Sequence, residues 1–269
     1  MITIAFIGGG NMAAAIVGGL IKGGRPARTM LVVDPGEAQR AKLEAEFGVR
    51  TLPAAGAPLD EAATVVWAVK PQLFESAAAP CAAHVGKALQ LSVMAGIRSG
   101  AIGRATGTQR VVRAMPNTPS LIGQGIAGLF AREAASAADR AEVETVLALT
   151  GRLLWVGREE DLDAVTALSG SGPAYVFYFV EAMVRAAVDM GLSAAQGREL
   201  ALATFAGAAS LAIGSDEPPS VLRERVTSKG GTTHAALASL EASGVQAAFV
   251  AAIKAAQRRA RELGDEYGD

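Results

Sequence analysis

Two glycine-bearing stretches contain the residues that could do chemistry. The first reads GGGNMA over residues 8–13 and follows a short apolar run, residues 2–7. It fits the pattern G-x-G-x-x-G/A, in which glycines permit a tight strand-to-helix turn and let the backbone approach a pyrophosphate. The helix that follows would point free N–H groups toward the phosphates. We therefore predict a dinucleotide site, whose cofactor-binding residues are Gly8, Gly10, Asn11 and Met12.

The second stretch reads VTSKGGTTH over residues 226–234, between two segments that look like apolar helices. A turn between helices needs one glycine, whereas this stretch has two, flanked by hydroxyl side chains. Backbone N–H groups at Gly230, Gly231 and Thr232, leading into a helix, would form an anion-binding nest. A helix start capped by Thr232 would explain the same residues without any ligand. The residues alone support both interpretations equally.

Polar side chains near the ends of the apolar runs add to the first site. Asp34 ends the second run, where a carboxylate accepts hydrogen bonds from ribose hydroxyls, and this favours NADH. Arg40 is near enough in sequence to meet a 2′-phosphate instead, and this favours NADPH. Lys70 ends the third run, just before Pro71, and we expect it to contact the cofactor.

The elements that must position these residues alternate along the first half of the chain. Runs that predict strands cover residues 2–7, 30–33, 64–69, 89–95, 110–115, 126–131 and 152–156. Helices are predicted at 11–22 and 37–47, each followed by glycine. Continuous hydrophobicity in the strands predicts burial on both faces of a parallel sheet. This order of elements predicts an α/β fold with a Rossmann-type doubly wound sheet.

The second half of the chain is predicted to be helical. Helices are expected at residues 174–190, 195–213, 220–226 and 244–263, and no strand is expected from residue 161 onward. These helices are apolar and rich in alanine, more than a domain of this size can hide alone, which favours dimerisation. We therefore divide the chain into a dinucleotide-binding domain, 1–157, and a helical substrate-binding and dimerisation domain, 158–269.

Composition argues against several classes of function. A net charge of −1, with no block of like charge, disfavours a nucleic-acid partner. The chain lacks a long uninterrupted apolar run and a signal-peptide pattern, so no membrane span is expected. The lone Cys81 suits a reducing compartment, and we expect a cytoplasmic protein. The two histidines, His84 and His234, are too isolated to predict a metal site.

Five motifs carry a resemblance that covers essentially the whole chain. They read FIGGGNMA, AVKP, RAMPNTP, LSGSGPAYVF and SKGGTT. Together they resemble the pyrroline-5-carboxylate reductase family in order and spacing. Two residues depart from the family pattern. Lys229 replaces the proline of the usual Ser-Pro-Gly-Gly loop, and His234 stands where an aliphatic residue is common.

The resemblance implies a specific reaction: reduction of the cyclic imino acid 1-pyrroline-5-carboxylate to L-proline, the last step of proline biosynthesis. It also implies NADPH as the cofactor, with NADH as the alternative, and a homodimer that can associate further. Thr233 is the expected catalytic residue, because its counterpart hydroxyl in the family reaches the ring nitrogen. The expected substrate-binding residues are Gly230, Gly231, Thr232 and Ser171, and Asn117 and Thr118 are placed near the nicotinamide.

Other functions are weighed against this one. β-Hydroxyacid dehydrogenases share the two-domain plan but place a catalytic lysine on the long helix that enters the second domain. The predicted helix 174–190 contains no lysine, so the base needed to oxidise an alcohol is missing. A related imine reductase is a further alternative. A non-catalytic NADP-binding regulator would not need the SGSGPAY and GGTT loops.

Overall fold

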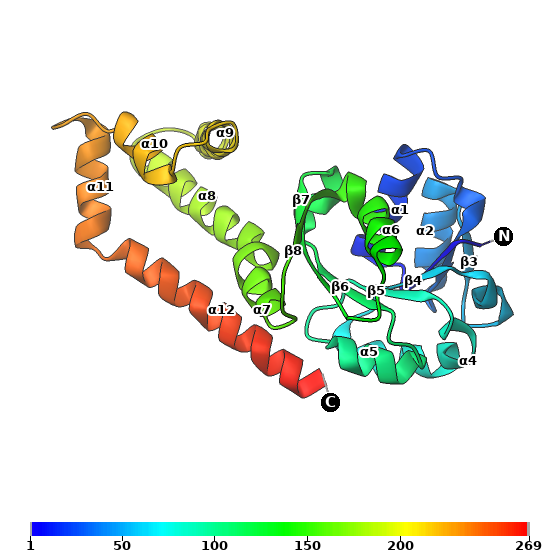
Figure 1. The fold of residues 1–269 in the computed structure, drawn as a ribbon. Helices are drawn as coiled ribbons and strands as arrows, with labels where there is room; N and C mark the ends of the chain where they lie inside the picture. Colours follow the sequence, from blue (N-terminus) through cyan, green and yellow to red (C-terminus); the bar gives the residue numbers. More distant parts are fainter. Residues whose placement is uncertain (1, 268–269) are drawn as a thin grey trace. The chain divides into compact units, whose positions relative to one another are not determined.

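A computed structural model describes residues 2–267 (Figure 1). Contacts divide the chain into two compact units. The first, the sheet unit, comprises the residues up to Pro173 together with those from Ala255 onward. The second, the helical unit, is Ala174–Lys254. The sheet itself ends at Trp155, close to the boundary at 157, but the compact unit around it extends further along the chain.

One eight-stranded sheet forms the centre of the first unit, in the order β3-β2-β1-β4-β5-β6-β7-β8. The strands are β1 Ile4–Ile7, β2 Met30–Val33, β3 Arg50–Leu52, β4 Thr64–Trp67, β5 Leu89–Ser92, β6 Val111–Met115, β7 Gly125–Ala131 and β8 Gly151–Trp155. All seven predicted runs form strands. Sequence analysis missed only β3, because it has three residues and starts on an exposed arginine.

The sheet is parallel except at one pair, where the prediction of a parallel sheet is corrected. β6 and β7 pair antiparallel, with Val112 opposite Ala131. The chain between these strands is too short for the crossover of a dozen or more residues that a parallel pair needs. β7 and β8 are again parallel, because α6 (Ala137–Leu147) provides a crossover between them. Both strands of the antiparallel pair are largely buried, so hydrophobicity could not reveal its direction.

Helices cover both faces of this sheet. The α-helices of the first unit are α1 Asn11–Lys22, α2 Glu37–Phe47, α3 Phe74–Ala78, α4 Ala82–Val85, α5 Ser99–Thr106, α6 and α7 Asp161–Val165. Short 3-10 turns are η1 Ala27–Thr29, η2 Ala57–Glu61, η3 Pro71–Leu73, η4 Ala79–Cys81, η5 Thr118–Ile122 and η6 Ala148–Thr150, and η7 Thr166–Gly170 is a π-helical turn.

The core consists of two apolar clusters, one on each side of the sheet. Ile4 and Phe6 belong to one cluster, and Ala5 and Ile7 belong to the other. Successive residues of a strand point to opposite faces, so a fully apolar strand supplies both clusters. This is the physical reason that β1 is apolar throughout, and it confirms the doubly wound α/β fold.

The second unit is built from helices, and no strand occurs among residues 161–267. The helices are α8 Gly172–Asp189, α9 Ala194–Ile213, α10 Pro219–Arg225, α11 Thr232–Ala242 and α12 Val245–Tyr267, of which α8 begins and α12 ends in the first unit. Phe249 packs edge-on against Tyr175 and Phe179, with ring centroids 5.7 and 5.5 Å away. These rings join α8 to α12 within the unit.

None of the helices in residues 2–267 is by itself long and apolar enough to cross a membrane. The pair α11 and α12 passes that test only when both helices are counted together across a bend of 56°.

Candidate functional site

A cavity of about 670 Å³ lies at the carboxyl ends of β1, β2 and β4. Ligands of open α/β sheets bind at these strand ends. Four of the residues predicted from the sequence, Gly8, Gly10, Asp34 and Lys70, line it together. Asn11 and Met12 form the first turn of α1 beside Gly10 but are not among the lining residues.

The glycine loop has the geometry that a pyrophosphate site needs. Gly8 has φ +93°, and a Cβ there would lie 2.7 Å from the carbonyl oxygen of Ala68. Glycine is therefore required for the turn itself. Gly10 is the N-cap of α1, and a Cβ there would meet no atom within 4 Å. The space beside Gly10 is open, so a phosphate could approach the free N–H groups at the start of α1.

Asp34 organises the backbone around the cavity. Its Oδ2 accepts a hydrogen bond from the Gly9 N–H, and its Oδ1 accepts one from the Gly36 N–H, both at 2.8 Å. The carboxylate thus ties the glycine loop to the loop that follows β2. A carboxylate can accept about four hydrogen bonds, so these contacts restrict the group without saturating it.

Two side chains of α2 complete this arrangement. Gln39 donates from Nε2 to the Gly9 carbonyl at 2.5 Å, so Gly9 is held from both sides. Arg40 donates from Nη1 to the carbonyls of Asp34 and Pro35, each at 2.8 Å. Sequence analysis named Arg40 but missed Gln39, because a glutamine in the first turn of a helix carries no signal of its own.

Lys70 and Cys81 also line this cavity. Lys70 is exposed and precedes the turn η3, so its ammonium group can reach the cavity. Cys81 is buried, and its Sγ donates to the carbonyl of Ala77. Burial raises the pKa of the Cys81 thiol to about 11, so the thiol stays protonated and is a poor nucleophile.

A second group of predicted residues lies at the carboxyl end of β6. Asn117 uses both ends of its amide there: Oδ1 accepts from the Ile126 N–H at 3.0 Å, and Nδ2 donates to the Ser169 carbonyl at 3.2 Å. Ser171 follows directly after the π turn η7, and its N–H donates to the Thr166 carbonyl. Thr118 is exposed and begins the turn η5. The sequence analysis did not predict this π turn.

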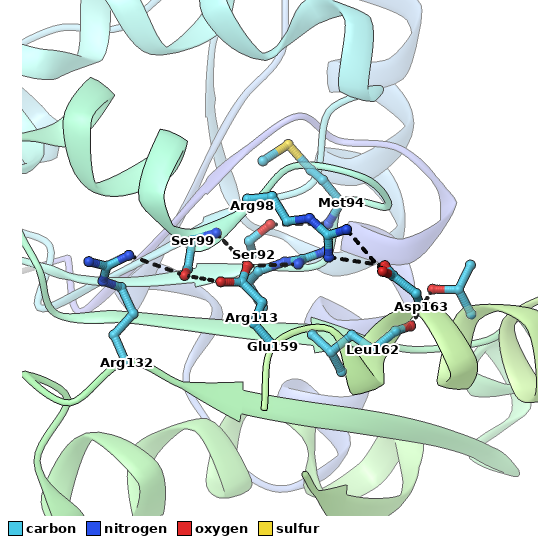
Figure 2. A network of polar contacts seen from close by, with 10 residues as sticks. Ser92, Met94, Arg98, Ser99, Arg113, Arg132, Glu159, Leu162 and Asp163 are labelled. Atoms are coloured by element: carbon cyan, nitrogen blue, oxygen red, sulfur yellow. Dashed lines mark hydrogen bonds and ion pairs between the residues drawn. The ribbon is translucent and has the colours of Figure 1, made fainter. Parts of the chain in front are cut away.

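An ionic network adjoins this region and was not found from the sequence (Figure 2). Glu159 accepts hydrogen bonds from the Ser99 N–H, the Ser99 hydroxyl and Arg113, at 2.6, 2.5 and 2.8 Å. Arg98 forms a bidentate pair with Asp163, at 3.0 and 2.9 Å. The partners are far apart in the chain, so no local pattern could have revealed them.

Burial and pairing act against each other in this network. Burial lowers the pKa of Arg113, and the charge of Glu159 offsets part of that effect. Burial would raise the pKa of Glu159, but the hydrogen bonds from Ser99 and the charge of Arg113 hold it below its usual value. Both groups therefore stay charged, and each depends on the other.

The second glycine stretch forms the start of α11 in the helical unit. Gly230 has φ +74°, and Gly231 is the N-cap, so the helix begins at Thr232. The interpretation of Thr232 as the cap is therefore wrong by one residue. Thr232 is the first helical residue after the cap and is exposed, whereas Thr233 is half-buried. The first N–H groups of a helix have no partner within it, so this loop directs donors outward.

The predicted residues thus form three groups: the cavity with Gly8, Gly10, Asp34 and Lys70, the β6 end with Asn117, Thr118 and Ser171, and the α11 start with Gly230, Gly231, Thr232 and Thr233. Within residues 2–267, no cluster of three or more His, Cys, Asp or Glu could hold a metal ion. His84 instead lies 2.8 Å from Asp60, measured from Nδ1 to Oδ1.

Two family models match the chain. The model described as "Pyrroline-5-carboxylate reductase dimerisation" matches residues 159–263. The model described as "NADP oxidoreductase coenzyme F420-dependent" matches residues 3–96. The first match spans most of the helical region, and the second spans the glycine loop and the residues that line the cavity.

Full-length proteins are also similar to the chain. Pyrroline-5-carboxylate reductase from Pseudomonas aeruginosa is 42% identical, with 98% of each chain covered. The Haemophilus influenzae enzyme of the same name is 41% identical, with 97% of each covered. Among solved structures, a pyrroline-5-carboxylate reductase from Coxiella burnetii is 35% identical, with a TM-score of 0.89 over 97% of this chain and 98% of that one. Plasmodium falciparum pyrroline carboxylate reductase, solved with NADP bound, is 26% identical, with a TM-score of 0.87 over 98% of each chain.

Proposed function

The chain belongs to the pyrroline-5-carboxylate reductase family, and from that premise we propose how its residues carry out the family reaction. The enzyme reduces 1-pyrroline-5-carboxylate to L-proline, using NADPH. The observation that supports this function best is the sequence identity to curated reductases over nearly their whole length. The aligned region includes both the cavity residues and the start of α11.

The residues present fit a dinucleotide. The open space beside Gly10 and the start of α1 suit a pyrophosphate, and Gly8 gives the turn that makes room for it. We assign Gly8, Gly10, Asn11, Met12, Asp34, Lys70 and Thr118 to the cofactor. When bound, NADPH supplies the hydride for the reaction.

A preference for NADPH is compatible with Asp34 because of what surrounds that residue. Two backbone N–H groups already bind its carboxylate, and the Arg40 guanidinium is anchored to the adjacent carbonyls. Arg40 donates only through Nη1 in these contacts, and a guanidinium has five N–H donors. We infer that the remaining donors meet the 2′-phosphate.

The start of α11 is assigned to the imino acid. The N–H groups of Gly230 and Thr232 would bind the substrate carboxylate, whereas the Gly231 N–H already donates to the Ser228 carbonyl at 3.0 Å and would shape the loop. Ser171 is assigned separately as a substrate-binding residue. Thr233 would hydrogen-bond the ring nitrogen through its hydroxyl. In the reaction a hydride adds to the carbon of the C=N bond, and that bond's π electrons pass to nitrogen, which carries a proton. Because an iminium is already electrophilic, positioning and electrostatics are sufficient without a metal or a strong base.

The helical region carries the family's dimerisation domain, and the chain forms a homo-oligomer. We propose a homodimer as the basic assembly and the cytoplasm as the compartment. We also keep residues 1–157 and 158–269 as the division between cofactor and substrate-binding functions.

The test is an absorbance assay with purified enzyme that follows the consumption or formation of NADPH. Three reactions are compared: with 1-pyrroline-5-carboxylate, with a β-hydroxy acid and NADP, and without substrate. Turnover with the imino acid alone, yielding proline, supports the proposal. Turnover with the hydroxy acid would point to a dehydrogenase, and no turnover with either substrate would point to a regulator.

A further inference from the structure

A run of helix from Asp161 to Asp189 changes type midway, between α7 and α8. The change is the π turn η7, closed by the Ser171 N–H donating to the Thr166 carbonyl five residues back, at 2.8 Å. π turns are rare, occur mostly as single turns inside α-helices, and are frequent at functional sites. The sequence must therefore contain a cause for this one.

The cause is Pro173. In an uninterrupted α-helix, the Ser169 carbonyl would accept a hydrogen bond from the N–H of residue 173. Proline has no N–H, and its ring clashes with the carbonyl four residues earlier. Ser169 lies in the wider π turn, and its carbonyl needs a donor other than the N–H of residue 173.

Asn117 supplies that donor from a different element. Its Nδ2 donates to the Ser169 carbonyl at 3.2 Å, and its Oδ1 is fixed by the Ile126 N–H at 3.0 Å. The amide thus bridges the end of β6, the start of β7 and the π turn. Each end of the amide has a partner in the protein, and the two contacts fix the orientation of the side chain.

Two close contacts hold the same turn against the sheet. A Cβ at Gly170 would lie 2.7 Å from the Met115 Cε, so the turn packs closely against the Met115 side chain at the end of β6. A Cβ at Gly128 would lie 2.7 Å from Val165 Cγ1, so glycine also lets α7 approach β7 closely. Packing and the Asn117 bridge therefore fix the turn at the carboxyl end of β6, the side on which ligands of this fold bind.

We propose that Asn117 is a positioning residue: it replaces the N–H that Pro173 lacks, and so holds the π turn that presents Ser171 to the substrate. The proposal rests on the proposed function for the role of Ser171. It also revises the expectation that Asn117 itself binds the cofactor.

The first test separates positioning from cofactor binding. Asn117→Ala is expected to lower kcat/KM for 1-pyrroline-5-carboxylate about fivefold to tenfold, the effect of one hydrogen bond. The NADPH dissociation constant, from fluorescence titration, should stay within about twofold of wild type, by contrast with the larger loss a direct ligand would cause. Gln124→Ala is the matched control, because Gln124 is an exposed amide on the same connection and its loss should change neither value. A weaker NADPH affinity with unchanged turnover would overturn the proposal and restore Asn117 as a cofactor ligand.

The second test is a double-mutant cycle with Pro173→Ala, which restores an N–H four residues after Ser169. In that background the further loss from Asn117→Ala should shrink to less than about twofold, because the carbonyl then has its own donor. Additive losses would refute the link between the two residues.

The coupling between Asn117 and Pro173 can also be measured from the urea unfolding midpoints of the same four proteins. This measurement does not require catalytic activity. If wild-type enzyme failed to reduce the imino acid, the proposed function would fall. The Asn117–Pro173 coupling and the NADPH affinity would still decide the positioning role.

Discussion

The two units of this protein differ in how much of their apolar surface they bury by themselves. Both faces of the sheet carry a continuous buried cluster, and ion pairs and backbone hydrogen bonds fix the loops around it. In the helical unit few residues are buried, among them Val180, Ala187 and Ala201. Large apolar side chains there stay exposed, such as Leu211 at 74% and Ile213 at 73%.

The difference indicates that the helical unit depends on a partner for stability, whereas the sheet unit does not. Monomeric proteins rarely expose large contiguous apolar surfaces. α9 exposes leucines on more than one side, so it lacks the polar, solvent-facing side of a typical surface helix. Variants in the helical unit should therefore change the assembly of the protein, whereas variants in the sheet unit should change its stability. The expected effects range from loss of the proposed dimer to a change in stability that is seen only at low pH.

The largest effect is expected at the exposed apolar surface of the helical unit, where we propose that the dimer contact lies. Leu200 and Leu211 lie on one face of α9, because eleven residues make about three turns. Replacing both with aspartate should raise the dimer dissociation constant at least 100-fold, since each buried leucine contributes about 1.5–3 kcal/mol. Light scattering at micromolar concentration should then detect monomer. An unchanged dimer would exclude this face from the interface.

A comparable loss is expected inside the sheet unit, without any change of assembly. Glu159→Ala leaves Arg113 buried and unpaired, because the Arg113 side chain is only 4% exposed. Removing one partner of a buried pair costs about 3–5 kcal/mol of unfolding free energy. Urea denaturation measures this loss. Arg158→Ala breaks an exposed pair next to it and serves as the control, with little expected change.

A smaller effect is expected at the start of α11, and it should touch the imino acid alone. Thr233→Val keeps the branched shape and removes the hydroxyl. The loss of one hydrogen bond to a charged group costs about 1.5–3 kcal/mol, or roughly ten- to a hundred-fold in kcat/KM. Steady-state kinetics should place that loss on the imino acid, with NADPH affinity unchanged. Thr232→Val should do much less, because the contribution of Thr232 is its backbone N–H. Equal losses in the two variants would remove the special role of Thr233.

The corresponding variant in the cavity should have the opposite signature. Lys70→Ala removes an exposed ammonium group that lines the cavity. If it binds a cofactor phosphate as proposed, its loss costs at most about 1 kcal/mol, or up to about fivefold. We expect the KM for NADPH to rise while the KM for the imino acid stays constant. The increase should diminish at high salt, because exposed charges are screened. A constant KM for NADPH would show that Lys70 does not contact the cofactor.

The smallest effect is a pH dependence confined to the sheet unit. The hydrogen bond from Arg110 lowers the pKa of Asp139, which also caps α6 together with Ser136. A carboxylate with a lowered folded-state pKa stabilises the protein above its unfolded pKa of about 3.9. That stability is lost as the pH falls through the folded-state pKa. The urea midpoints of wild type and Asp139→Asn should therefore converge between about pH 5 and pH 2. A constant gap over that range would show that the charge of Asp139 is unimportant.

The local patterns predicted much of the fold. β1 reads as a buried strand because every residue of it is apolar, and α1 begins where the glycines allow the turn. Such features depend on neighbours in sequence, so spacing alone reveals them. The pattern also predicts a helix start near Thr232, as observed, but not the cap residue, because Gly231 and Thr232 are both acceptable N-caps.

The site required more than local pattern. Gln39 was missed because it binds the Gly9 carbonyl, 30 residues away, and the sequence of α2 gives no sign of that contact. The contacts of Glu159 with Ser99 and Arg113 join residues that are 60 and 46 positions apart. Asn117 was identified as a site residue, but the motif around it could not say that its amide would reach Ser169.

The sequence by itself determined seven of the eight strands, most of the longer helices, the glycine loops and, through its motifs, the family. Those features follow from backbone conformation and from burial on one or two faces, which short stretches encode. Tertiary structure alone decided the antiparallel step at β7, the hydrogen bonds that occupy Asp34 and Asn117, and the pairing of Arg113 with Glu159. Each of these depends on which distant polar groups the folded chain brings within about 3 Å, the range of a hydrogen bond.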